Sequence, residues 1–274
     1  MAKTNAPRRE NPNVADRAKT VVAWLRWRGS ARARDGMARY GLPSDHAFGI
    51  AMNVMQRYAK ELGRDHDLAL ALWETGGYEA RTVAAFVADP DRLTPAQMDH
   101  WCGDFDNWGI CDTVCFHLFD RTPHAWRKVA AWSRRRDEFG KRAAFALLAC
   151  LALHDKAARD EKFVAALPLV DRAATDDRNF VKKGVSWALR LIGRRSLALN
   201  AAAVATARRL AASDVPPARW IGSGAVKELT SAAVVRRLNR SAAPSRDRSG
   251  TPARRAPRSR SESPRSSAAA RSRR

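Results

Sequence analysis

The sequence predicts an all-α protein made of helix pairs that stack on one another. Apolar residues recur with helical spacing along most of the 274 residues, and no stretch shows the sustained alternation of a β-strand. Gly and Pro stand between segments of about 10–20 residues, which is typical of short connections between helices. With 45% hydrophobic residues, a chain of this length can bury a large core.

The breaks between the predicted helices divide the chain into about eleven or twelve segments, hence five or six antiparallel pairs. Exact self-similarity is absent, but degenerate pairs of about 35–45 residues are typical of HEAT-like repeats. We therefore expect a curved α-solenoid with a concave basic face. The Gly and Pro breaks fall at Gly41–Pro43, Gly76–Gly77, Pro90, Pro95, Pro123, Pro168, Gly193 and Pro216–Pro217.

Two of the expected helices open with a capping signal. Ser44 precedes the segment DHAFGIAMNVM, and Thr94 precedes PAQMDHW with Pro95 at the first helical position. A hydroxyl at the N-cap accepts a hydrogen bond from a free backbone N–H of the first turn. The sequence therefore predicts that helices begin directly after Ser44 and Thr94.

Charge is distributed over three expected regions. Lys and Arg number 50 against 28 acidic residues, which gives a formal net charge of +22. Residues 240–274 are almost entirely Arg, Ser, Ala and Pro, and we expect this tail to be disordered because it can bury little apolar surface. We expect residues 1–14 to form a flexible lead and residues 15–239 to form the repeat domain, which is basic in its own right.

A basic surplus of this size indicates a polyanionic partner, because neutralised phosphates release counterions. No apolar run approaches the roughly 18–20 residues that span a bilayer, and the polar N-terminus does not resemble a signal peptide. We therefore expect a cytoplasmic monomer that binds nucleic acid rather than a membrane, and that is nucleoid-associated in a bacterial cell. The four cysteines lack the spacing of a zinc site, so neither a metal nor a cofactor is expected.

The helix expected over 180–195 carries a polar, aromatic face opposite a clean apolar stripe. Trp187 lies on this face. The cations around it recur every three or four residues, which places them on the same side of the helix. An aromatic ring among cations suits a nucleic-acid surface, whereas the alternative is a Trp that packs on a neighbouring repeat beside solvated charges. The cations of this face are Lys183, Arg190 and Arg194.

The helix expected over 107–119 contains a carboxylate in apolar surroundings. Asp104, Asp106 or Asn107 can cap the helix, so Asp112 lies too far inside to be a capping residue. Asp112 shares a face with Trp108. A carboxylate in that setting needs a partner or a raised pKa, and it is either functional or one half of a structural ion pair.

Arg142 stands at the start of a buried helix expected over 138–153. The eleven residues after it carry no charge. A functional Arg142 would face a phosphate or keep Asp112 ionised. The alternatives are that its guanidinium extends to water or pairs with Glu138 one turn earlier.

These segments together resemble the AlkD-like DNA alkylation repair glycosylases, which are HEAT-like repeat proteins. The resemblance extends over roughly residues 22–238. The family pattern has a Trp and an Asp four residues apart, an Arg on a later helix, and a Trp on another. Its matches are Trp108 and Asp112 in NWGICD, Arg142 in GKRAAFALL, and Trp187 in FVKKGVSWALR.

The resemblance implies hydrolysis of the N-glycosidic bond of positively charged alkylated purines, of the 3-methyladenine and 7-methylguanine type, in double-stranded DNA. It gives Asp112 the catalytic role, places Trp108 and Trp187 beside the deoxyribose, and has Arg142 hold the backbone. A second alignment, slid by three residues, puts Cys111 and Cys115 in place of the Trp and the Asp, and so leaves no catalytic carboxylate.

Three classes of function stay open on the sequence. The first is a monofunctional alkylpurine DNA glycosylase, and the second is a non-catalytic relative that recognises distorted or branched DNA. The third is a protein-binding helical scaffold, against which the cations around Trp187 argue. A Schiff-base lyase using Lys182 or Lys183 is the weakest alternative, because nothing in their sequence context points to an activated amine.

Overall fold

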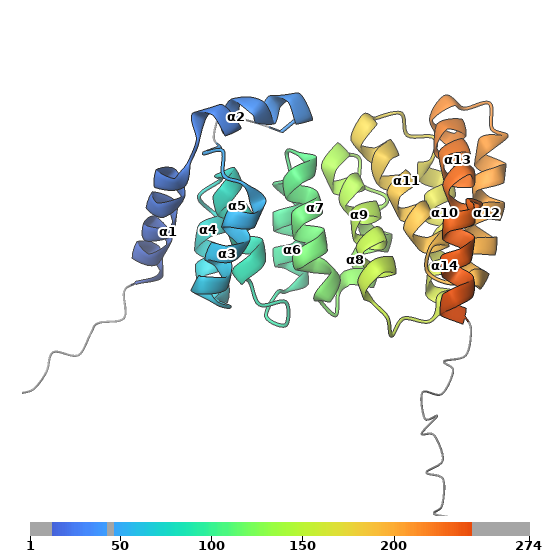
Figure 1. Ribbon diagram of the computed structural model, residues 1–274. Coiled ribbons are helices and arrows are strands. Elements are labelled where there is room, and N and C mark those ends of the chain that lie inside the picture. The colour runs from blue at the N-terminus through green and yellow to red at the C-terminus, as the bar shows by residue number, and fades with distance from the viewer. Residues whose placement is uncertain (1–12, 43–46, 243–274) are drawn as a thin grey trace, which may run out of the picture. The chain divides into compact units, whose positions relative to one another are not determined.

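The computed structural model describes residues 13–42 and 47–242. Over these residues the chain forms fourteen α-helices and two short 3₁₀ helices, and no strand (Figure 1). The all-α prediction is confirmed. The helix count exceeds the expected eleven or twelve because several helices, such as α2 and α4, span only seven or eight residues.

The helices follow one another with short connections throughout. Their bounds are α1 Val14–Arg28, α2 Ala31–Met37, η1 Ala38–Tyr40, α3 Met52–Leu62, α4 His66–Trp73, α5 Tyr78–Val87, α6 Pro95–Gly103, α7 Trp108–His117, η2 Phe119–Arg121, α8 Ala125–Trp132, α9 Glu138–His154, α10 Asp160–Ala173, α11 Asn179–Gly193, α12 Leu197–Ala211, α13 Pro216–Leu229 and α14 Ala232–Ala242.

Eight of the helices from α4 to α13 are arranged as successive pairs. Helix α4 packs on α5, α8 on α9, α10 on α11, and α12 on α13. The second helices of these pairs and α7 also contact one another in sequence order, α5 on α7, α7 on α9, α9 on α11 and α11 on α13. We call these five helices the second-helix layer, and Figure 1 shows the pairs standing side by side. The predicted stacking of helix pairs is thus confirmed.

Helix starts follow local capping chemistry where the sequence offers it. The Thr94 hydroxyl accepts from the Gln97 N–H while the Gln97 side chain accepts from the Thr94 N–H, which forms a capping box with Pro95 at the first helical position. The prediction at Thr94 is confirmed. Asp65, Asn107 and Asp137 likewise cap α4, α7 and α9 with their side chains.

The predicted helix after Ser44 is wrong over residues 47–51, and Ser44 itself lies outside the described residues. Helix α3 begins only at Met52, after a nonhelical stretch. The fully buried Glu79 carboxylate accepts hydrogen bonds from the backbone N–H groups of residues 48, 49 and 50, which holds this stretch away from a helix. Gly49 has a φ of +77°, and a Cβ there would come within 2.4 Å of backbone atoms of α2 and Ser30.

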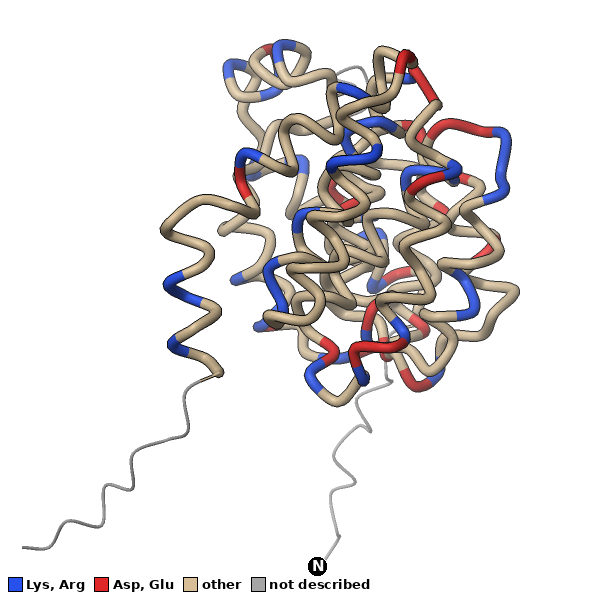
Figure 2. The backbone as a smooth tube through the Cα atoms, turned by 90° about the vertical axis from the view of Figure 1, so that its right-hand side faces the viewer, with Lys and Arg blue, Asp and Glu red and all other residues tan. Residues whose placement is uncertain are grey.

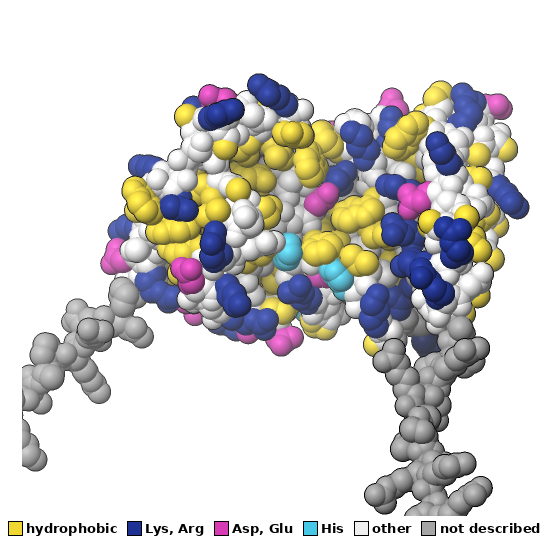
Figure 3. Space-filling model, in the orientation of Figure 1, with side chains coloured by type: hydrophobic (Ala, Val, Ile, Leu, Met, Phe, Trp, Pro, Cys, Tyr) yellow, Lys and Arg dark blue, Asp and Glu magenta, His cyan; other side chains and the backbone are white. Residues whose placement is uncertain are grey.

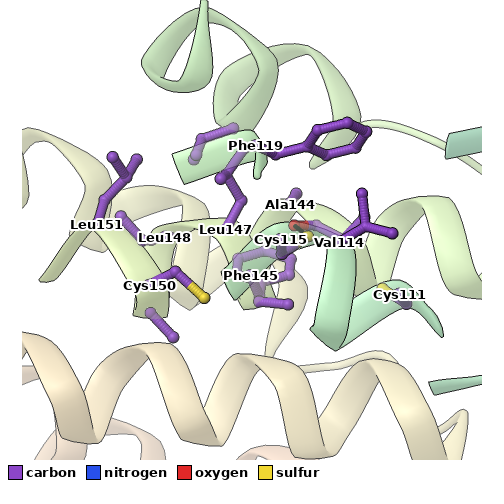
Figure 4. Packing of buried hydrophobic residues seen from close by; sticks show 14 of the residues in the cluster. Cys111, Val114, Cys115, Phe119, Ala144, Phe145, Leu147, Leu148, Cys150 and Leu151 are labelled. Atoms are coloured by element: carbon purple, nitrogen blue, oxygen red, sulfur yellow. Dashed lines mark hydrogen bonds between the residues drawn. The ribbon is translucent and has the colours of Figure 1, made fainter. Parts of the chain in front are cut away.

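The core is continuous through the helix pairs. Figure 4 shows its centre, where buried side chains of α7, η2 and α9 point toward one another. Helix α9 is buried on nearly its whole circumference from Arg142 to Ala152, because α7, α8 and α11 all pack against it. All four cysteines are buried free thiols, and burial raises the pKa of Cys102, Cys115 and Cys150.

The ends of the repeat region differ slightly from the predicted boundaries. Helix α1 begins at Val14 with Asn13 as its cap, and α14 continues to Ala242, three residues into the predicted tail. The rest of the predicted tail, 243–274, lies outside the described residues, as do residues 1–12 of the predicted lead.

Positively and negatively charged residues differ in where they lie along the helices of the described residues. In Figure 2, Lys and Arg positions are spread over the helices, whereas Asp and Glu positions gather mostly toward the helix ends. None of the helices in this part of the chain is both long and apolar enough to cross a membrane. Within the same residues, no group of three or more His, Cys, Asp and Glu side chains is arranged to hold a metal ion.

Candidate functional site

A cavity of about 570 Å³ lies where α7, α9 and the start of α11 meet the η1 segment. We call it the Asp112 cavity. Its walls contain one carboxylate, three cations and three aromatic rings, so it offers flat apolar surfaces beside charges of both signs. The lining residues are Arg39, Tyr40, Gly41, Trp108, Asp112, Arg142, Asn179, Phe180 and Lys183.

The start of α7 positions Trp108. Asn107 caps the helix by accepting from the Ile110 N–H at 2.9 Å, so that Trp108 is its first residue. The Trp108 indole N–H donates to the Tyr40 carbonyl at 2.8 Å, which joins α7 to the η1 segment. Gly109 permits this close approach, because a Cβ there would come within 2.7 Å of the Leu42 side chain.

Asp112 and Arg142 form a two-pronged ion pair between α7 and α9. The Arg142 Nε donates to Asp112 Oδ1 at 2.9 Å, and Nη2 donates to Oδ2 at 2.7 Å. The Arg142 side chain is 7% exposed and that of Asp112 is 21% exposed. Parallel charge-assisted bonds of this kind fix both orientation and charge. The pair thus holds the carboxylate rigidly while leaving one edge open to the cavity.

Arg142 and Glu138 together fix the start of α11. The Arg142 Nη1 donates to the Phe180 carbonyl at 2.7 Å, and the Glu138 carboxylate accepts from the Phe180 N–H at 3.0 Å. Arg142 therefore faces neither water nor Glu138. This geometry favours the role of holding Asp112 over contact with a DNA backbone, because three of the five guanidinium N–H groups are already used.

The surroundings of the ion pair act on its pKa values in opposite directions. Burial raises the pKa of Asp112, and the nearby Arg142 guanidinium and its hydrogen bonds oppose that rise. The Asp112 carboxylate raises the pKa of Arg142 against the effect of burial, so the guanidinium stays charged. Asp112 consequently takes up a proton at a higher pH than an ordinary aspartate.

The structure brings together four of the seven predicted site residues. Trp108, Asp112, Arg142 and Lys183 all line the Asp112 cavity. Trp187 lies one turn beyond Lys183 on α11, and it lines a second cavity, of about 610 Å³, together with Arg194. Trp187 and Asp112 thus line different cavities, and the place of Trp187 beside the deoxyribose stays a prediction.

Arg190 and Arg194 are partly engaged in ion pairs. The Glu228 carboxylate on α13 accepts from Arg190 Nη1 at 2.8 Å and from Arg194 Nη1 at 3.4 Å. Arg190 lines neither the Asp112 cavity nor the second cavity. One carboxylate shared by two guanidinium groups leaves one positive charge in excess on this side of α11.

The alternative alignment through the cysteines does not fit the cavity. Cys111 and Cys115 are fully buried, and their Sγ atoms face the Phe139 and Ala143 carbonyls of α9. Asp112 lines the cavity, and neither cysteine does. The structure thus supports the alignment that keeps Trp108 and Asp112.

The η1 side of the cavity was not predicted from the sequence. Arg39 and Tyr40 line it from a segment far away in sequence, and the Tyr40 side chain is 72% exposed. Asn179 and Phe180 were also overlooked as lining residues. The available signal was an aromatic next to an Arg directly before Gly41, but the contact with α7 depends on tertiary packing.

The face of the molecule shown in Figure 3 has an uneven distribution of charge. Lys and Arg side chains gather over the C-terminal helices on the right of this view. Apolar side chains and two histidines occupy the middle of the face. This arrangement places a cationic region beside an apolar one on the same face.

Comparison with known proteins agrees with this architecture. The family model described as DNA alkylation repair enzyme matches residues 21–222. One solved structure is similar with a TM-score of 0.63 and 23% identity over 69% of this chain and 81% of the other. It is described as a new family of proteins related to the HEAT-like repeat DNA glycosylases with affinity for branched DNA structures.

That likeness establishes a shared fold, so the predicted HEAT-like repeat architecture is confirmed. No match was found among curated proteins. The family model extends over well more than half of the chain and includes α7, α9 and α11, which form the Asp112 cavity. The chain belongs to the DNA alkylation repair enzyme family.

Proposed function

We propose that this protein is a monomeric, monofunctional DNA glycosylase for positively charged alkylated purines, such as 3-methyladenine and 7-methylguanine. Duplex DNA would lie on a concave basic surface formed by the second-helix layer, with the damaged nucleotide at the Asp112 cavity. Trp187, Arg190 and Arg194 would contact the strand beyond that nucleotide. The observation that carries the proposal is the Asp112 carboxylate, fixed by Arg142 and open on one edge.

The carboxylate suits the charge that develops during cleavage of the N-glycosidic bond. As the C1′–N bond breaks, its electron pair leaves with the purine, and the sugar acquires oxocarbenium character. A preorganised negative charge beside the sugar stabilises that state. A cationic alkylated purine departs as a neutral base, so the reaction requires no general acid.

Asp112 can also position the attacking water. Its two oxygens have about four lone pairs, and Arg142 uses two of them, which leaves acceptor capacity on the exposed edge. Water adds its oxygen to C1′ and loses one proton, which the Asp112 carboxylate can accept. Trp108 and Phe180 supply apolar walls, and Lys183 supplies a cation for a neighbouring phosphate.

The direct test is release of free base from methylated DNA. Purified protein is incubated in excess with duplex DNA containing 7-methylguanine or 3-methyladenine, and the released base is quantified by mass spectrometry. The proposal expects release of these cationic purines without strand cleavage, and no release from undamaged duplex. Failure to release any alkylated purine above the spontaneous rate would contradict it.

A second candidate function is recognition of branched DNA without catalysis. Both carboxylate oxygens of Asp112 already accept from Arg142, which is also what a purely structural ion pair would do. The solved relative of the same fold is described as having affinity for branched DNA structures. This candidate expects a four-way junction to bind more tightly than linear duplex, with no base released from either substrate.

A further inference from the structure

The second cavity, which contains Trp187, has a concentration of cations that the proposed catalysis does not use. It lies between the end of α9, the start of α10, the end of α11 and α14, and its volume is about 610 Å³. We call it the Lys156 cavity. Its lining residues are Ala152, Leu153, Lys156, Asp160, Trp187, Leu191, Arg194, Arg195, Ser196, Arg237 and Ser241.

One of the four cations in the Lys156 cavity has a structural role. Arg195 donates to the Ala152 carbonyl at 3.2 Å and to the Ala158 carbonyl at 2.7 Å, and its Nε lies 3.6 Å from Asp160. Its guanidinium also stacks over the Phe163 ring, 4.5 Å from the ring centroid. Arg195 and Asp160 therefore neutralise each other.

The remaining cations are in excess. Over the described residues, neither Lys156 nor Arg237 forms an ion pair with a carboxylate, and Arg237 donates to the Arg194 carbonyl instead. Arg194 shares Glu228 with Arg190. Like charges around one hollow repel each other, and an anionic ligand relieves that repulsion.

The other walls of the Lys156 cavity fit the neutral part of a nucleotide. Leu153 and Leu191 supply apolar surface beside the half-buried Trp187 ring. No acceptor among the described residues receives the Trp187 indole N–H, so that donor is available to a ligand. An aromatic ring beside cations matches a sugar or base next to its phosphate.

The two cavities are spaced to contact one DNA strand at separate points. Lys183 lines the Asp112 cavity, and Arg194 lines the Lys156 cavity eleven residues later along α11. At 1.5 Å rise per residue this is about 16 Å of helix, which matches the axial rise of about five nucleotides of one strand. A single phosphate cannot occupy both cavities, whereas a continuous strand reaches both.

We propose that the Lys156 cavity binds a backbone phosphate of DNA several nucleotides from the damaged base, with Lys156 and Arg237 as its principal cations. The site contributes affinity for any duplex, damaged or undamaged, and does not take part in bond cleavage. This inference rests on the proposed DNA-binding function, and it adds a second anchoring point outside the Asp112 cavity.

The test is salt-dependent binding of a fluorescently labelled, undamaged 24-base-pair duplex to the full chain. Each phosphate contact contributes about 0.9 to the logarithmic salt slope, so the double variant Lys156→Ala, Arg237→Ala should lower the slope by about 1.8. If the wild type and the variant bind equally at 1 M salt, the same relation predicts that at 0.15 M salt the variant binds about fivefold more weakly for each lost contact. The loss of both contacts then weakens binding about thirtyfold.

Matched variants separate a specific site from general electrostatics. Arg172→Ala, Arg208→Ala removes the same charge from exposed positions of α10 and α12 outside the cavity, and should change the slope by much less. Arg237→Lys keeps the charge and should keep the slope. Both Lys156 and Arg237 are exposed, so melting temperatures should stay close to that of the wild type.

The outcomes distinguish this inference from the proposed function. If the wild type binds the duplex and the Lys156, Arg237 variant binds with the same slope, the phosphate site is wrong and the glycosylase proposal stands. An equal loss in the Arg172, Arg208 variant would also overturn it. If the wild type does not bind duplex DNA at all, both proposals fail together.

Discussion

Replacing Arg142 by Gln separates the structural role of the ion pair from its chemical role. The change removes two charge-assisted hydrogen bonds to Asp112 and one to the Phe180 carbonyl. Removing one partner of a buried ion pair costs about 3–5 kcal/mol, and the 21% exposure of Asp112 favours the lower end. For a domain of this size, about 3 kcal/mol corresponds to a fall in Tm of about 6–12 °C.

The same variant should alter the pH dependence of base release. Arg142 opposes the burial that raises the pKa of Asp112, so its removal raises that pKa further. The acid limb of the single-turnover rate profile should therefore move to higher pH, with activity recovering as the pH rises. A carboxyl whose pKa is higher in the folded than in the unfolded state makes the variant more stable at low pH, and this stability is lost as the pH rises through the folded pKa.

The assay compares Tm and single-turnover release of 7-methylguanine between about pH 5 and 9 for the wild type, Arg142→Gln, and the double variant with Asp112→Asn. The double variant should recover part of the lost Tm, because it removes the unpaired carboxylate, and should remain inactive at every pH. An Arg142→Gln protein with an unchanged acid limb would refute the coupling between Arg142 and the Asp112 charge.

Three further predictions test other parts of the structure. Glu79→Gln should lower the free energy of unfolding by about 2–3 kcal/mol in thermal melts. The backbone N–H groups now share a carboxylate with two acceptor oxygens, whereas an amide has one. An unchanged Tm would contradict the role of Glu79 in holding this backbone stretch. Burial lowers the pKa of His117 to about 4, and Arg121 and His154 add to the shift. Because the unfolded chain then takes up a proton at this residue more readily than the folded protein does, its contribution to stability should be lost as the pH falls from about 6.5 to 4. Denaturant melts of His117→Leu should lack that component, and an identical pH dependence would show it arises elsewhere. Trp108→Phe should lower the free energy of unfolding by about 1 kcal/mol, because the hydrogen bond to the Tyr40 carbonyl is lost, and it should also slow base release. A wild-type stability together with a wild-type release rate would argue against the indole contact.

The helical content and the identity of the central ion pair were accessible from the sequence. Apolar periodicity and Gly or Pro breaks are local signals, and they predicted stacked helix pairs correctly. Asp112 and Arg142 each stood out as a charge in an apolar helix, and burying one charge requires a partner nearby. The structure joins the two directly.

The parts that the sequence did not predict depend on contacts between distant segments. Residues 47–51 carry a helical pattern, but Glu79, some thirty residues later, captures their N–H groups. Tyr40 reaches the Asp112 cavity only because η1 crosses to α7. The cavity that Trp187 lines likewise combines residues of α9, α10, α11 and α14.

The central claim is that the Asp112 charge stabilises the transition state for base release, and one measurement addresses it. Single-turnover release of 7-methylguanine is compared between the wild type and Asp112→Asn at saturating protein, with the fold of each preparation checked by Tm. We predict a rate lower by about 10²–10³, the scale expected for loss of one transition-state electrostatic contact, and DNA affinity within a few-fold of wild type or tighter. A folded Asp112→Asn protein that releases the base at the wild-type rate would contradict the catalytic role of Asp112.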